Sequence, residues 1–122
     1  MMLSKCSNVK PSIADRFEHI AAALSGIRKI TTGQTRESFK EDFLVGIGVE
    51  RLLGIVSEAS RHIPSELKAQ EPGINWRELA DLGNWLRHAY HRTDPDLIWA
   101  MIENDLEPLR IFIERTAKEL KR

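Results

Sequence analysis

The stretch FKEDFLVGIGVERLLGIVSEASRHI, residues Phe39–Ile63, decides the fold of this chain. Apolar residues lie nearly all round its middle, while Glu50, Arg51 and Glu58 mark one charged face. Valine and isoleucine are also common in strands, but the length of the pattern and its charged face favour a helix. A helix that is apolar on most sides is packed among other helices. The stretch therefore predicts the central helix of an all-α bundle.

The same stretch contains three glycines, and two good capping residues lie near its start. Thr35 and Ser38 are both favourable N-cap residues, so we expect the helix to begin near one of them. Gly46, Gly48 and Gly54 each cost roughly 1 kcal/mol relative to alanine in a helix interior. We expect a neighbouring helix to approach closely at these glycines and to offset that cost.

A second helical pattern precedes the central one. TTGQT (Thr31–Thr35) ends it, with Gly33 as the expected stop. Pro11 and Ser12 come just before its first residue. Its apolar residues are three or four apart, which places them on one stripe: Ile13, Phe17, Ile20, Leu24 and Ile27.

A third helical pattern follows Pro64, which is expected to end or kink the central helix. Asn75 is a suitable cap in front of WRELADLGNWLRHAYH, and we expect a helix from there to His91.

A fourth helical pattern completes the chain. TDPD (Thr93–Asp96) is a turn that starts it, with Pro95 in the first turn of the helix. Apolar residues from Ile98 to Leu120 keep helical spacing, and Pro108 should bend the helix. The sequence therefore predicts an all-α antiparallel bundle of four main helices with short extras.

The length of 122 residues fits one compact domain. We interpret residues 1–12 as a flexible N-terminal tail and residues 13–122 as the helical bundle domain. The first residues lack the apolar centre of a secretory signal, and no apolar run has membrane-spanning length. The single cysteine, Cys6, excludes an internal disulfide, so a cytoplasmic setting is the simplest interpretation.

The charge balance also restricts the function. Lysine and arginine total 18, and aspartate and glutamate total 18 as well. A net charge of zero argues against the broad basic surface that binds duplex DNA. It leaves room for a small local site for phosphate.

One short segment gathers reactive side chains. LRHAYH (Leu86–His91) holds half of the four histidines, with an arginine before them and the one tyrosine between them. On a helix that continues to His91, residues three or four apart share a face. The inward stripe is then Trp76, Leu79, Leu82 and Leu86, with Trp85 beside it. The adjoining polar stripe is Asn84, Arg87, His88 and His91, bordered by Tyr90.

Spacing alone leaves three interpretations of this cluster. Cations near a helix C-terminus interact favourably with the helix dipole, so the cluster can be a solvated helix end. A metal site is disfavoured, because His88 and His91 share a turn but no third ligand follows at a diagnostic spacing. The third interpretation is phosphate chemistry.

A ribonuclease that works without a metal needs the parts that this cluster contains. A histidine with an ordinary pKa of about 6.5 exchanges protons near neutrality, and an arginine holds a phosphate with its fork of donors. One group activates the ribose 2′-hydroxyl and another protonates the leaving oxygen. Two copies of one helix across a two-fold axis can place such groups on both sides of the phosphorus. Trp85 and Trp99 are candidates either for that subunit contact or for the core.

The chain as a whole resembles a known family. GVERLLGIVSEASRHIPSELKA and INWRELADLGNWLRHAYHRTDPDLIWAMIENDLEPL are similar to the HepT-like branch of the HEPN superfamily. The similarity extends from about Ala14 to Leu120. The resemblance implies an all-α bundle that pairs as a homodimer. It also implies the toxin of a toxin–antitoxin pair, whose antitoxin is a minimal nucleotidyltransferase (MNT).

The family motif is an arginine, four to six residues, then His-x-Tyr, with asparagine or another polar residue after the arginine. His88-Ala89-Tyr90 matches the second part, and Asn84 matches the polar position. The resemblance therefore implies that His88 is the catalytic histidine of RNA cleavage and that Asn84 has an orienting role. It implies that the partner adds AMP to Tyr90, which silences the toxin.

The chain departs from this motif at Gly83, where the family has its arginine. Arg87 lies one helical turn later, and we hypothesise that its side chain reaches nearly the same place. His91 and Arg92 are secondary candidates in the same cluster. The first expectation is a metal-independent endoribonuclease toxin with an RNA substrate. The alternative is a weak or inactive HEPN module that binds RNA or nucleotide and its MNT partner. Neither requires a cofactor or a metal.

Overall fold

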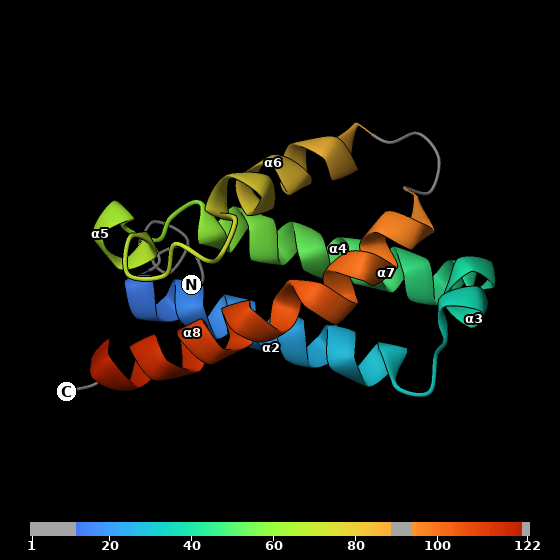
Figure 1. The fold of residues 1–122 in the computed structure, drawn as a ribbon, viewed down its shortest axis with the longest axis horizontal. Coiled ribbons are helices and arrows are strands. Elements are labelled where there is room, and N and C mark those ends of the chain that lie inside the picture. The colour runs from blue at the N-terminus through green and yellow to red at the C-terminus, as the bar shows by residue number, and fades with distance from the viewer. Residues whose placement is uncertain (1–11, 89–93, 121–122) are drawn as a thin grey trace, which may run out of the picture.

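The structure is a computed structural model and describes residues 12–88 and 94–120. Within these ranges the chain forms seven helices and no strand, which confirms the all-α fold. Figure 1 shows long helices that run in alternating directions, with α4 between α2 and α6. The helices are α2 (Ile13–Thr31), α3 (Arg36–Glu41), α4 (Phe43–Ser60), α5 (Ser65–Lys68), α6 (Trp76–Arg87), α7 (Pro95–Asn104) and α8 (Leu106–Leu120).

Helix α2 begins and ends close to the predicted positions. The Ser12 hydroxyl accepts a hydrogen bond from the Asp15 N–H, and the Asp15 carboxylate accepts one from the Ser12 N–H, at 3.0 and 2.9 Å. This capping box fixes the first turn. Gly33, with a φ of 81°, takes the left-handed conformation just beyond the helix. The predicted stripe is buried except for Ile13, which is exposed.

The predicted central helix is divided into α3 and α4. Thr35 caps α3, as expected, but the chain leaves the helical conformation at Asp42. The Asp42 carboxylate accepts a hydrogen bond from the Val45 N–H at 3.1 Å and so caps a new helix. The prediction of one unbroken helix was wrong, because the short side chain of aspartate is well suited to the N-cap position.

Helix α4 is central only over part of its length. Val49, Leu53 and Val56 are fully buried, as predicted for the core. At its start, by contrast, Phe43 and Leu44 are 61% and 79% exposed. The expectation that this helix packs among other helices therefore holds only beyond its first turns.

The close approach expected at the α4 glycines occurs at Gly48. A Cβ there would lie 3.1 Å from Cδ1 of Ile30 on α2. At Gly54 a Cβ would meet nothing within 4 Å, so the expectation was wrong for that glycine.

The last predicted helix is divided as well. Pro95 lies in the first turn of α7, as expected, but the chain breaks at Asp105 and α8 begins at Leu106. The break precedes Pro108 because a proline ring collides with the carbonyl four residues earlier, here that of Asn104. The predicted bend at Pro108 is therefore a full break three residues upstream. None of the helices in the described ranges is long and apolar enough to cross a bilayer.

Candidate functional site

Helix α6 carries the predicted site, and its start is firmly held. The Asn75 side chain accepts a hydrogen bond from the Glu78 N–H at 3.0 Å, which confirms the predicted cap. The Trp76 indole N–H donates to the carbonyls of Lys68 and Glu71 at 3.1 and 3.2 Å. These bonds tie the first turn of α6 to the segment that precedes it.

A single hydroxyl group fixes the middle of α6 against α4. Ser57 is buried on α4, and its Oγ donates to the Ala80 carbonyl at 3.2 Å. The same Oγ accepts a hydrogen bond from the Gly83 N–H at 2.9 Å. Ser57 therefore joins the two helices one turn before Arg87 and His88. We call this contact the Ser57–Gly83 clip.

The clip occupies the space that a side chain at position 83 would need. A Cβ on Gly83 would stand 2.6 Å from the Ser57 Oγ and 3.2 Å from the Ser57 Cβ. Real Cβ atoms essentially never come within 3.0 Å of such an atom, so a side chain at this position would force Ser57 or the helix backbone to move. Sequence reasoning missed Ser57, and the one signal for it was a glycine inside a helix at the motif position.

The Arg87 side chain reaches back along α6 toward Gly83. Its Nη1 lies 3.7 Å from the point where a Cβ on Gly83 would stand. Side chains on a helix lean toward its N-terminus, so an arginine one turn later naturally covers this spot. The guanidinium group of Arg87 therefore lies close to the backbone of position 83. That it takes the role of the family arginine stays a prediction.

His88 lies at the end of α6, next to Arg87. The helix ends at Arg87, and His88 is its exposed C-cap residue, with its N–H bonded to the Trp85 carbonyl at 3.3 Å. The expected continuous helix through His88 was therefore wrong. A cation at this position still interacts favourably with the negative end of the helix dipole. Three other predicted residues, Tyr90, His91 and Arg92, lie outside the described residues.

The faces of α6 differ in part from the prediction. Leu79 and Leu82 are buried and Asn84 is exposed, as expected. Trp85 was predicted to lie beside the inward stripe, but it is 43% exposed. Gly83 is buried instead. Trp99 belongs to the core, where it packs against Phe39 with ring centroids 5.3 Å apart. Only Trp85 is therefore left as a surface tryptophan of the two considered.

Glu58 of α4 is paired with His62, four residues further along the chain. Its carboxylate bonds to the His62 ring at 3.2 Å, and that hydrogen bond lowers the pKa of the Glu58 carboxyl group. Over residues 12–88 and 94–120, no three side chains of the types that bind metals gather at one point. The chemistry that these residues offer is that of a guanidinium group on the last turn of α6 and an imidazole group at its C-cap.

Comparison with known proteins identifies the family of the chain. The family model described as "Ribonuclease HepT-like" matches residues 20–116. The chain belongs to the HepT-like ribonuclease family. It is 34% identical over 110 residues to "Probable ribonuclease HepT" of Thermococcus cleftensis, which covers 90% of this chain and 100% of that protein.

A second relative of this HepT-like chain is "Putative RNase MJ1380" of Methanocaldococcus jannaschii. The two are 30% identical over 76 residues, which is 62% of this chain and 70% of that protein. No solved structure matches the chain. The family predicted from the sequence is thus confirmed.

Proposed function

We propose that this HepT-like protein is a metal-independent endoribonuclease that acts as a toxin and is silenced by an MNT-type nucleotidyltransferase. RNA is the proposed substrate, and a homodimer is the proposed active form. Family membership supports the class of reaction. The observation that carries the proposal for this chain is the Arg87 guanidinium group, whose Nη1 stands 3.7 Å from the Cβ position of Gly83.

The proposed reaction is an internal transfer on the RNA strand. The ribose 2′-oxygen attacks the adjacent phosphorus, the bond from phosphorus to the 5′-oxygen breaks, and a cyclic phosphate and a 5′-hydroxyl result. A base removes the 2′-hydroxyl proton and an acid gives a proton to the 5′-oxygen. His88 from each of two subunits supplies these roles, because the two-fold axis places one imidazole on each side of the phosphorus.

Arg87 and Asn84 complete the proposed site. The guanidinium group stabilises the charge that builds up on the phosphate oxygens, and it does so most strongly in the transition state. Asn84 lies on the exposed face of α6 and orients the substrate through its amide group. His91 and Arg92 are secondary candidates for binding phosphate.

Tyr90 is the proposed site of control. Its hydroxyl oxygen attacks the α-phosphorus of ATP on the partner enzyme, forms a tyrosyl–AMP bond and releases pyrophosphate. The added phosphate brings negative charge and bulk next to His88 and Arg87. It would then occupy the position of the RNA phosphate and pair with the cations there. Family membership supports this part of the proposal.

The second candidate function is a HEPN module that binds RNA or nucleotide and its partner without cleavage. Gly83 favours this candidate, because the position of the family arginine has no side chain and the Ser57–Gly83 clip leaves no room for one. In this case Arg87 would hold a phosphate but would not be placed for the transition state.

Cleavage and binding of a labelled single-stranded RNA by the purified protein separate the two candidates. We expect the parent protein to cleave, and the His88→Ala protein to bind RNA with similar affinity but not to cleave. Loss of toxicity on expression without the partner should accompany the loss of cleavage. Binding without cleavage by the parent protein would favour the second candidate. Full cleavage by His88→Ala would reject the proposed mechanism.

A further inference from the structure

A groove runs between α6 and α7, on helices whose main packing partners differ. Helix α6 packs on α4, whereas α7 packs on α3 and α8. At its wider end, the groove is a cavity of about 370 Å³. At its narrower end, a second cavity of about 120 Å³ continues toward Asn75 and Pro108. We call this feature the α6–α7 groove.

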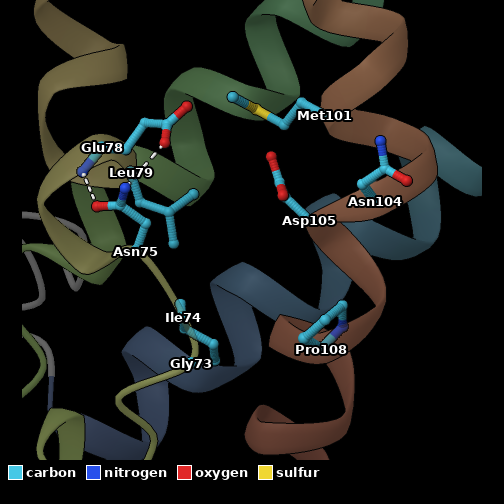
Figure 2. A pocket seen from close by; sticks show the side chains of 9 residues that line it. All are labelled: Gly73, Ile74, Asn75, Glu78, Leu79, Met101, Asn104, Asp105 and Pro108. Atoms are coloured by element: carbon cyan, nitrogen blue, oxygen red, sulfur yellow. Dashed lines mark hydrogen bonds between the residues drawn. The ribbon is translucent and has the colours of Figure 1, made fainter.

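The two cavities form one continuous groove. Glu78, Met101, Asn104 and Asp105 line both of them. Figure 2 shows the narrower end, where Glu78 of α6 and Asp105 lie on opposite sides of the opening. From Asn75 to Trp85 the groove follows α6 for about three helical turns, or roughly 15 Å. A partner that fills it must therefore be elongated.

The floor of the groove is apolar and the rim is acidic. Among the lining residues, the exposed large apolar side chains are Trp85 of α6 and Leu97 of α7, at 43% and 59% exposure. Both line the wider cavity and offer apolar surface to a partner. Carboxylates of Glu78, Asp81 and Asp105 surround it, and among the residues that the structure describes no lysine or arginine lines either cavity. The charge of the rim attracts cations and repels the phosphates of RNA.

We propose that the α6–α7 groove is the docking site for an amphipathic helix of a protein partner, with an apolar stripe flanked by lysine or arginine. A helix laid in a groove of this length presents anchors at positions i, i+4 and i+7. The apolar anchors cover Trp85 and Leu97, and the basic flanks meet the acidic rim. The inference is independent of RNA cleavage, because it uses neither Arg87 nor His88.

A fluorescein-labelled helical peptide tests the proposal against the intact protein. The peptide carries leucines at i, i+4 and i+7 with lysines on both sides, and a second peptide has glutamates in place of the lysines. We expect fluorescence anisotropy to show at least about tenfold tighter binding of the lysine peptide. Equal affinity for both peptides, or no binding of either, would overturn the proposal.

Variants of the groove locate the binding. Leu97→Asp removes an exposed apolar anchor, and Asp81→Lys/Asp105→Lys reverses the charge of the rim. Each should weaken binding of the lysine peptide at least about tenfold, and the double variant should come to prefer the glutamate peptide. Glu41→Lys/Glu119→Lys changes the net charge equally at two exposed positions that line neither cavity, and should bind like the parent.

Other occupants of the groove give different results. If a second copy of the chain fills it, sedimentation will show a dimer that Leu97→Asp dissociates, and the peptide will compete with that dimer. If RNA fills it, an unlabelled oligonucleotide will displace the peptide, and Leu97→Asp will lose affinity for RNA. Either result would overturn the assignment to a separate protein partner.

Discussion

At the scale of single residues, the site depends on where Arg87 places its guanidinium group. We expect Arg87→Ala to lower the rate of RNA cleavage by about 10²–10³-fold, the usual cost of losing one donor to a developing anion. Arg87→Lys should recover only part of the rate, because an ammonium group lacks the planar fork of donors. Single-turnover cleavage of a labelled RNA measures both effects.

Arg77→Ala is the matched control for that experiment. Arg77 lies on the same helix, and its side chain is 94% exposed. Its removal should leave cleavage unchanged. An Arg87→Ala protein that cleaves at the parent rate would show that the phosphate is held by another group.

The Ser57–Gly83 clip gives a second prediction at this scale. Gly83→Ala should lower the free energy of unfolding by roughly 1–3 kcal/mol, because the new methyl group meets the Ser57 Oγ. In a Ser57→Ala background the same change should cost much less, since the nearest atom is gone. Urea unfolding of the four proteins yields the coupling energy.

Gly54→Ala is the control for that cycle. Gly54 is also helical, but a Cβ there meets nothing within 4 Å. The change should raise the free energy of unfolding by up to about 1 kcal/mol, which is the gain in helix propensity. Equal costs of Gly83→Ala in both backgrounds would refute the proposed role of Ser57.

At the scale of helices, the capping box of α2 gives a prediction about pH. Hydrogen bonds from the backbone and then the side chain of Ser12 lower the pKa of the Asp15 carboxyl group. The stabilisation is therefore fully present above the unfolded pKa of about 4 and is lost as the pH falls through the lower folded value. Asp15→Ala removes the carboxylate that accepts the hydrogen bond from the Ser12 N–H. It should destabilise the protein at neutral pH, and the difference from the parent should shrink on acidification.

Urea midpoints at neutral and acidic pH measure this effect. Ser25→Ala, at an exposed position within α2, is the control and should show no change of its effect with pH. A destabilisation by Asp15→Ala that stays constant into the acid range would mean that the charge of the Asp15 carboxylate takes no part in the cap.

The helices themselves were largely predictable, but their breaks were not. Periodicity identified every long helical segment, because one buried stripe repeats along each of them. The breaks at Asp42 and Asp105 divide two of these segments, and the apolar pattern continues across both. Asp42 ends one helix and caps the next through its own side chain. Its carboxylate competes with the backbone carbonyls for the N–H groups of the chain, and the spacing of apolar residues carries no sign of this.

Only those residues of the site that helical spacing places on α6 could be predicted. The positions of Asn84 and Arg87 on α6 followed from spacing, and Asn75 was identified as its cap. Ser57 was missed because its partners lie 23 and 26 residues further along the chain. A contact between distant segments leaves no periodic trace in a single sequence.

At the scale of the whole molecule, the proposed homodimer predicts the activity of mixed dimers that contain parent and variant chains. If both His88 side chains serve one cleft, a dimer with one His88→Ala chain is inactive. Equal amounts of parent and variant, co-expressed to exchange subunits, should then retain about a quarter of the parent specific activity. Independent sites would retain about half. Cleavage assays on the mixture, with the subunit ratio checked by mass spectrometry, decide between them.

The clip between α4 and α6 also couples evolutionary change at two positions of this chain. An arginine introduced at position 83 first meets a hydroxyl group 2.6 Å from its Cβ, so it is harmful while serine stands at position 57. Loss of that hydroxyl removes the closest contact, so it lowers the cost of any side chain at position 83. Positions 57 and 83 therefore constrain each other: the residue that one tolerates depends on the residue at the other.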